Sequence, residues 1–422
     1  MALSMTSRQR VKAALEHKPV DRVPLDFGGT VLTGAHVSIV AKLRQALGLP
    51  NKPPVKVCEP AQMLGEVAED LQKLLQVDVV MLPSTHNVYG FPNADWKPWR
   101  TFDGTDVLVP GLFNTTPAPD GSILMYPQGD TSVPPSAKMP NGGFYFDAII
   151  RQEPIDEARL NPADNLEEFQ LLDEAALRAM EKNAAALYAA TDCAISSGLP
   201  GTAFGDIFLV PGPALKHPKG IRDLEEWYIS TISRRDYILE VFDRQAEIAL
   251  KNLEMMYQAV GDKIQAVFVC GTDLAAQETL FCNLDAYRQL YKPFHKRIND
   301  WIHAHTGWKT MKHCCGACRP LIEGFIEAGF DALNPVQCSA KGMEPEGLVE
   351  DFGDRIVFWG GGVDTQKTLP FGTPDEVYRQ VQERVEVFSR KKGFVFAAIH
   401  NIQCNTPVDN VIAMFRALGR SF

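Results

Sequence analysis

The fold is decided by residues 308–337, WKTMKHCCGACRPLIEGFIEAGFDALNPVQ. Two strand-like runs, 308–316 and 330–337, enclose a helical stretch that Pro320 opens and Gly329 ends. This segment predicts one strand–helix–strand unit of a parallel α/β fold. Capping signals at Thr6 and Thr373 mark two further helix starts along the chain.

The same alternation continues through most of the 422 residues. The middle of most strand-like runs is continuously apolar, as in parallel strands that are covered on both faces. The runs are 22–28, 77–83, 193–198, 264–273, 308–316, 330–337, 355–364 and 393–403. About eight such units predict a closed (β/α)8 TIM barrel rather than an open sheet. We therefore expect residues 1–422 to form a single barrel domain.

Residues 88–160 interrupt this rhythm. The segment is rich in Gly, Pro and Asp, and Pro119-Asp120-Gly121 is a tight-turn signal. We interpret it as a β-hairpin insertion after the second strand. Because a loop of this length in a compact domain is usually functional or mobile, we expect it to act as a lid over the barrel mouth.

Composition narrows the class of protein. The chain is 45% hydrophobic, has a formal net charge of −10 and shows no basic stripe, so we expect neither nucleic acid nor an anionic membrane as a partner. The start, MALSMTSRQRVKAALEHKP, lacks the apolar core of a secretory signal, and no apolar run is long enough to span a membrane. Nine irregularly spaced cysteines do not form a disulfide framework, which indicates a reducing cytoplasm.

Metal-ligating side chains gather where a barrel has its active site, at the C-terminal ends of the strands. His313 and Cys315 end the fifth strand. Residues two apart on a strand share a face, so this pair can bind one ion while Cys314 points away. A histidine and a thiolate together favour zinc. The alternative is a buried apolar cysteine beside a hydrogen-bonded histidine.

A third ligand is expected near the eighth strand, where His400 and Cys404 face the same side of an extended chain. At least one of them should bind the ion. A structural histidine and a cysteine packed against the last helix are the alternatives. Cys315 and Cys318 form a C-x-x-C, for which a redox pair is a further interpretation.

Polar side chains at other strand ends complete the expected site. Asp273 ends the fourth strand and Glu278 follows it. A carboxylate there could be a metal ligand, a partner of a ligand, a general acid or only a helix N-cap. The expected substrate-binding residues are Asp26, Asn334, Asp364 and Asn401.

Over nearly its whole length the chain resembles the uroporphyrinogen decarboxylase superfamily, whose fold is a (β/α)8 barrel. The resemblance lies in TSRQRVKAALEHKPVDRVPLDFGGT (6–30), HCCGACRPLIEGFIEAGFDALNPVQ (313–337), RIVFWGGGVDTQ (355–366) and AAIHNIQCNTPVDNVIAMF (397–415). True decarboxylases have an arginine-rich Arg-Gln-Ala-Gly-Arg segment after the first strand. Here that position reads Asp26-Phe27-Gly28-Gly29-Thr30. Porphyrinogen decarboxylation is therefore not expected.

The chain looks more like the zinc methyltransferase branch, such as the methylcobamide:coenzyme M methyltransferases and related demethylation enzymes of anaerobes. Their zinc motif is His-x-Cys followed much later by Cys. His313 and Cys315 match the first part, and the nearby Thr406-Pro407 aligns the later cysteine with His400 rather than Cys404. The third ligand is thus either His400 or Cys404.

This resemblance implies a zinc-dependent methyltransferase that works with a corrinoid (cobalamin). It would move a methyl group between a small methylated substrate (a methyl ether, methylamine or thiol) and the corrinoid of a partner protein. The corrinoid should arrive on a separate chain, because no B12-binding Asp-x-His-x-x-Gly occurs here. A homodimer is the expectation for the class. The alternatives are a metal-free decarboxylase and a non-catalytic corrinoid-binding scaffold.

Overall fold

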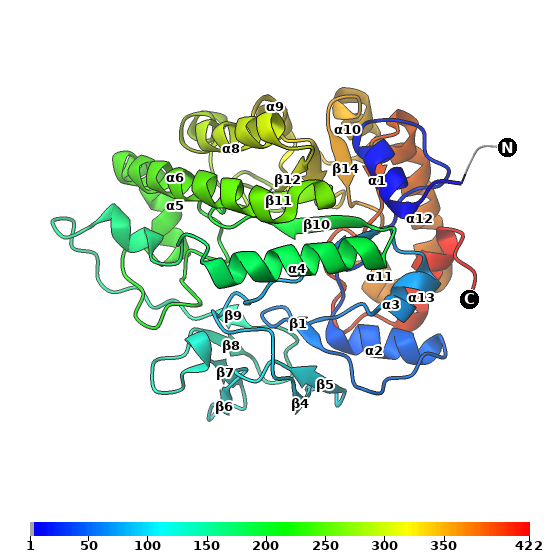
Figure 1. Cartoon of the computed structure of the whole chain (residues 1–422), viewed down its shortest axis with the longest axis horizontal. Coiled ribbons are helices and arrows are strands. Elements are labelled where there is room, and N and C mark those ends of the chain that lie inside the picture. Colours follow the sequence, from blue (N-terminus) through cyan, green and yellow to red (C-terminus); the bar gives the residue numbers. More distant parts are fainter. Residues whose placement is uncertain (1–3) are drawn as a thin grey trace.

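The computed structural model describes residues 4–422 and confirms the barrel. Its centre is a seven-stranded parallel sheet, of which Figure 1 labels β10, β11, β12 and β14. The strand order is β15-β14-β13-β12-β11-β10-β3. The strands are β3 (Val79–Met81), β10 (Ala194–Gly198), β11 (Ala266–Cys270), β12 (Lys309–His313), β13 (Ala332–Asn334), β14 (Val357–Trp359) and β15 (Phe394–Val395). Seven of the predicted runs therefore form strands in the predicted order.

The remaining run, residues 22–28, joins the two edges of this sheet without forming a named strand. Leu25 makes a parallel bridge with Phe396, next to β15, and Asp26 makes one with Val79 of β3. The Asp26 N–H donates to the Phe396 carbonyl at 2.8 Å. Pro24 has no N–H with which to extend the ladder, which keeps this contact short. The parallel sheet is thus closed through residues 25–26.

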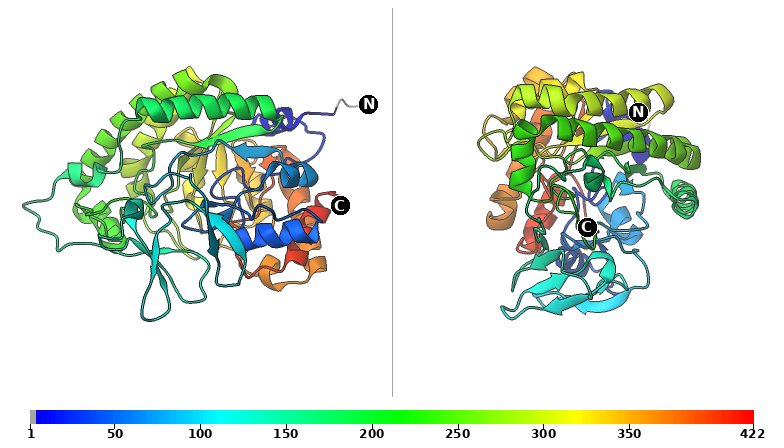
Figure 2. Two further views of the ribbon diagram at one scale, coloured as in Figure 1. Left: turned by 60° about the horizontal axis from the view of Figure 1, so that its bottom comes forward. Right: turned by 90° about the vertical axis from the view of Figure 1, so that its left-hand side faces the viewer.

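Helices cover the outside of the barrel (Figures 1 and 2). They are α1 (Ser7–Leu15), α2 (Val37–Ala46), α3 (Glu69–Leu75), α4 (Glu174–Ala190), α5 (Leu224–Ser233), α6 (Arg235–Val260), α7 (Leu284–Ala286), α8 (Lys292–His305), α9 (Arg319–Glu327), α10 (Pro345–Phe352), α11 (Thr368–Phe371), α12 (Pro374–Phe388) and α13 (Val408–Ala417). Capping boxes at Thr6 and Thr373 confirm the two predicted helix starts. Within residues 4–422, no helix combines the length and apolarity that crossing a membrane requires.

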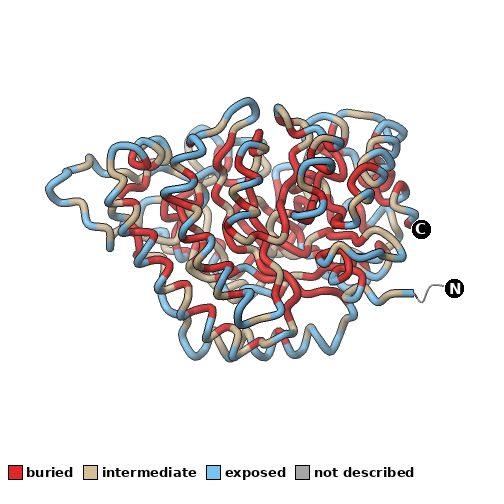
Figure 3. Tube along the Cα trace, turned by 90° about the horizontal axis from the view of Figure 1, so that it is seen from above, coloured by how far each residue is buried: buried red, intermediate tan, exposed pale blue. Residues whose placement is uncertain are grey.

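The interior of the barrel is filled by an inner layer of side chains to which all seven strands contribute. This cluster contains Val79, Ala194, Ala266, Met311, Ala332, Val357, Trp359 and Val395. Val11, Ala14 and Leu15 of α1 pack against it and close the N-terminal end of the barrel. A second, larger cluster fills the space between strands and helices, and buried segments run through the centre of the molecule (Figure 3). Polar side chains that follow the inner layer along a strand therefore reach the C-terminal end of the barrel.

The inserted segment contains two small antiparallel sheets rather than one hairpin. They comprise β4 (Lys97–Arg100) with β5 (Asp106–Val109), and β6 (Thr115–Pro117), β7 (Ile123–Met125), β8 (Ala137–Met139) and β9 (Asp147–Ala148) in that order. The Pro-Asp-Gly signal does mark a turn, between β6 and β7. The sheets lie beside the short hairpin β1 (Val57–Glu59) and β2 (Leu64–Gly65), away from α6, α8 and α9 (Figure 2). A lid role stays a prediction.

Candidate metal centre

Three side chains, two from the middle strand of the sheet and one from an edge, converge at the C-terminal end of the barrel. His313 ends β12, Cys315 follows two residues later, and His400 lies on the segment after β15. Their ligand atoms all lie within 4.8 Å of one another. The Cys315 Sγ is 3.3 Å from the His313 Nε2, and the ring centroids of His313 and His400 are 6.0 Å apart. The structure thus brings together three of the four predicted ligands.

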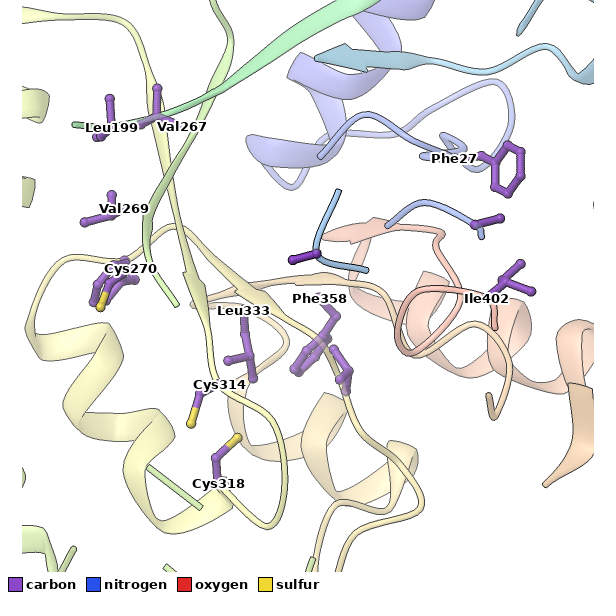
Figure 4. Packing of buried hydrophobic residues seen from close by; sticks show 14 of the residues in the cluster. Phe27, Leu199, Val267, Val269, Cys270, Cys314, Cys318, Leu333, Phe358 and Ile402 are labelled. Carbon is purple, nitrogen blue, oxygen red and sulfur yellow. The ribbon is translucent and has the colours of Figure 1, made fainter. Parts of the chain in front are cut away.

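Strand alternation explains which residues of the His-Cys-Cys-Gly run reach this cluster. Met311 belongs to the inner layer of the barrel, so His313 lies above it on the same face of β12. Cys314 points the other way, into the core between strands and helices, where its sulfur faces that of Cys318 (Figure 4). Cys318 therefore lies opposite Cys314 and not opposite Cys315. The geometry does not favour a Cys315–Cys318 redox pair.

His313 is held by a neighbouring strand in the form that binds metals. Its Nδ1 lies 2.7 Å from the Oδ1 of Asn334, and the Nδ2 of Asn334 donates to the Trp359 carbonyl at 2.9 Å. Because the amide nitrogen is engaged by a carbonyl, the amide oxygen faces His313 and accepts its Nδ1 proton. The Nε2 lone pair is then free and faces the Cys315 sulfur.

In the turn after β12, the backbone N–H groups of Cys315 and of the next residue each donate to a side chain from another segment. The Asp273 Oδ1 accepts the Cys315 N–H at 2.6 Å and lies 3.8 Å from the His313 Nε2. The Gly316 N–H donates to the Gln337 side chain at 2.7 Å. Gly316 has φ +85, and a Cβ there would lie 2.5 Å from the Ala276 carbonyl oxygen, so only glycine fits this turn. Gln337 was not predicted from the sequence.

The electrostatics of the cluster suit a bound cation. Burial lowers the pKa of His313, and burial followed by the charge of His313 lowers the pKa of His400 to about 4. Both imidazoles are therefore neutral near pH 7, which is the form that ligates metals. Burial and then Asp273 raise the pKa of the Cys315 thiol well above its usual range. A divalent cation would reverse this effect by stabilising the thiolate.

The donor set fits zinc in number, type and spacing. Three protein donors, all of them histidine nitrogen or cysteine sulfur, match the number and the ligand types of a zinc site that keeps an open position. Nitrogen and sulfur ligands of a tetrahedral zinc ion lie about 3.6 Å apart. The Sγ–Nε2 distance of 3.3 Å is close to this value.

Two predicted site residues lie outside the cluster. The Cys404 Sγ contacts the Asp103 Oδ2 at 3.5 Å and faces the inserted sheets, because the chain turns between Gln403 and Thr406 instead of staying extended. Glu278 is exposed on the loop after β11. The expectation that residues 400 and 404 share a face assumed an extended chain.

The four predicted substrate-binding residues are buried and hydrogen-bonded to protein groups. Asp26 accepts from the Trp359 Nε1 and the Gly29 N–H, both at 2.8 Å. Asn401 donates to the Val31 carbonyl and accepts from the Gly34 N–H. Asp364 accepts the Gln366 N–H at 2.7 Å, and Asn334 holds His313 as described above. A role of these residues in substrate binding stays a prediction.

Comparisons with known proteins agree with this architecture. Residues 218–420, which include His313, Cys315 and His400, match the family model described as Uroporphyrinogen decarboxylase (URO-D). The structure is similar to that of a methyltransferase from Methanosarcina mazei, with a TM-score of 0.57 and 17% sequence identity over 98% of each chain. At this identity the likeness concerns the fold. By sequence, no curated protein matches the chain.

Proposed function

We propose that this chain, a member of the uroporphyrinogen decarboxylase superfamily, is a zinc-dependent methyltransferase. It would move a methyl group between a small methylated substrate (a methyl ether, methylamine or thiol) and the corrinoid of a partner protein. The observation that carries the proposal is the convergence of His313, Cys315 and His400 at the C-terminal end of the barrel. The family match and the methyltransferase of similar fold support it.

In this proposal the three protein ligands of the zinc ion would be His313, Cys315 and His400. The ion would supply Lewis-acid chemistry at its open position, where it would polarise the heteroatom that carries the methyl group. Asn334 would keep the His313 proton on Nδ1 and leave the Nε2 lone pair available to the ion. Asp273 holds the backbone of Cys315 in place through a 2.6 Å hydrogen bond. The corrinoid protein and a homodimeric state remain predictions from the sequence.

A metal-free decarboxylase accounts less well for these observations. Such an enzyme would need cations that hold substrate carboxylates, but the segment 26–30 contains no arginine. Lys312, beside His313 in the chain, is fully buried on the other face of β12, where its Nζ donates to the Thr272 carbonyl at 2.7 Å. Decarboxylation would also leave the three converging metal donors without a role.

Metal analysis combined with a methyl-transfer assay tests the proposal. We expect about one zinc per chain after purification under reducing conditions. We also expect transfer to a free reduced corrinoid from at least one class of methylated substrate. His313→Ala and Cys315→Ser should lose both zinc and transfer. Cys58→Ser should retain both, because this half-buried cysteine lies in the β1–β2 hairpin and contacts the Leu64 carbonyl.

The rival functions give different results in the same experiment. Zinc far below one per chain, or activity that survives Cys315→Ser, would favour a metal-free decarboxylase. Corrinoid binding that persists in the His313→Ala, Cys315→Ser double variant, without any methyl transfer by the wild type, would indicate a scaffold.

A further inference from the structure

A second carboxyl group, that of Asp206, lies on the wall of the barrel beside the candidate metal centre. Asp206 belongs to the segment between β10 and α5, and its residue is only 9% exposed. Its Oδ1 accepts the Phe208 N–H at 2.9 Å. The sequence did not predict it, because residues 199–223 show neither strand nor helix periodicity.

Gly271 creates the space that this carboxyl group occupies. A Cβ at Gly271 would lie 2.4 Å from the Asp206 Oδ2 and 2.9 Å from the tip of the Phe268 ring. The carboxyl group and the ring tip therefore meet over the same glycine, two residues before Asp273. The Phe268 ring in turn packs edge-on against the His313 ring, with centroids 6.3 Å apart. Asp206 thus lies next to the aromatic side chain that borders the metal ligand.

The surroundings of Asp206 let it keep its proton to a higher pH than an ordinary aspartate does. Burial and then the negative charge of Asp273 raise the pKa of Asp206 to about 6, although Lys312 and the N–H groups of Phe208 and Gly271 act in the opposite direction. Asp273 itself accepts the Cys315 N–H. Two nearby carboxyl groups thus have different environments, a pattern that is typical of acid–base sites.

We propose that Asp206 is the general acid that protonates the leaving oxygen of a methyl ether substrate. This inference rests on the proposed function. The bond between oxygen and the methyl carbon breaks and leaves its electron pair on oxygen, which takes the Asp206 proton and becomes a hydroxyl group. The methyl carbon takes the electron pair of the reduced corrinoid on the partner protein. Asp206 ends as a carboxylate and regains its proton from water.

Asp206→Asn tests this role, because asparagine keeps the shape and an acceptor oxygen for the Phe208 N–H but has no acidic proton. The matched control is Asp223→Asn, in the same segment, where the carboxylate accepts the Glu226 N–H at 3.0 Å. Both variants and the wild type are assayed with methyl aryl ethers whose phenols differ in acidity. All three proteins should carry the same amount of zinc.

We expect Asp206→Asn to lower kcat about 100-fold for ethers of weakly acidic phenols and only a few-fold for ethers of strongly acidic ones, which leave without a proton. KM should change little, and Asp223→Asn should behave as wild type. If Asp206→Asn lowers kcat equally for all ethers, or does not lower it, Asp206 is not the general acid. The proposed methyltransferase function would still stand in that case. A zinc-loaded wild type that demethylates no ether in the panel would overturn the role as well, and transfer from amines or thiols would then show whether the proposed function survives.

A second readout does not depend on activity. In protein with 13C-labelled aspartate carboxyl groups, the wild type should show a signal that titrates near pH 6. This signal should vanish in Asp206→Asn and remain in Asp223→Asn. Its persistence in Asp206→Asn would assign the proton to another group and overturn the role.

Discussion

Asn334 and His313 form a hydrogen-bonded pair across neighbouring strands, with Oδ1 and Nδ1 2.7 Å apart. The two residues are register partners in the pairing of β13 with β12, so the barrel itself aligns them. Asn334 also donates to the Trp359 carbonyl of β14, which prevents its amide from turning over. Three adjacent strands thus determine which nitrogen of His313 is available to a metal ion.

Removing this hydrogen bond should weaken zinc binding. We expect Asn334→Ala to lower zinc affinity about 10- to 100-fold, because the ring loses the group that fixes its orientation and its proton. Asn334→Asp retains an acceptor oxygen and should recover part of the loss. Competition with a chelator measures the affinity.

Asn299→Ala is a suitable control for the cost of losing a buried asparagine. Its Nδ2 donates to the Ala328 carbonyl at 2.8 Å, at the C-terminal end of α9, and contacts none of the three cluster residues. This variant should unfold more easily but bind zinc as tightly as the wild type. Equal affinities for the Asn334 and Asn299 variants would contradict the positioning role.

The choice between His400 and Cys404 as third ligand leads to a second prediction. His400 lies within the cluster, whereas Cys404 contacts Asp103 of the inserted segment. His400→Ala should therefore reduce zinc occupancy strongly, and Cys404→Ser should leave it near one ion per chain. Elemental analysis after dialysis under reducing conditions measures both. A zinc-free Cys404→Ser protein that is still folded would show that the segment rearranges when metal binds.

Sequence patterns anticipated the barrel and the His313–Cys315 pair because both depend on local periodicity. The alternation of strands and helices predicts the sheet, and a spacing of two places both side chains on one face. The third ligand depends on how residues 398–406 turn, which periodicity does not describe. Asp206 depends on a contact with Gly271, 65 positions along the chain, and such tertiary contacts leave no local signal.

Asp26 is a second example of a tertiary environment that the sequence does not reveal. Its position at a strand end made it a candidate for substrate binding, and no sequence pattern indicates that it is 1% exposed and hydrogen-bonded to Trp359, 333 residues away. An aspartate at a strand end looks the same in the sequence whether it faces a substrate or a buried indole.

The burial of Asp26 predicts a specific pH dependence of stability. Burial raises its pKa from 3.8 to about 7, so between these values the folded state holds a proton that the unfolded state has lost. The contribution of Asp26 to the free energy of unfolding should therefore fall as pH rises from about 4 to about 7, by on the order of 4 kcal/mol. Asp26→Asn, which does not titrate, should lack this decline.

Chemical denaturation of wild type and Asp26→Asn at several pH values checks this prediction. The difference in unfolding free energy between the two proteins is the relevant quantity, because other titrating groups contribute equally to both. The difference should shift in favour of the variant as pH rises, on top of a constant offset from its altered hydrogen bonds. A difference that does not vary with pH would mean that Asp26 titrates alike in the folded and unfolded states.

Asp78 should be a main determinant of barrel stability, because it ties residues 22–25 to the edge of the parallel sheet. It is fully buried next to β3, and it pairs with Arg10 of α1 and with Arg22, each at 2.6 Å. Its Oδ2 also accepts the Leu25 N–H at 2.8 Å, beside the bridge that closes the barrel. One carboxylate therefore pairs with two arginines, of which Arg10 also pairs with Asp21, and fixes the first strand-like run.

Asp78→Asn should lower the free energy of unfolding by about 3–5 kcal/mol, because the buried Arg10 and the half-buried Arg22 lose the carboxylate that they share and Arg10 keeps only Asp21. Asp243→Asn is the matched control, since Asp243 pairs with Arg297 at 2.9 Å but both side chains are exposed. Loss of this exposed ion pair should lower the free energy of unfolding by no more than about 1 kcal/mol. Urea unfolding followed by circular dichroism measures both variants. Equal losses would mean that Asp78 contributes no more than a surface ion pair and that other contacts hold the barrel closed.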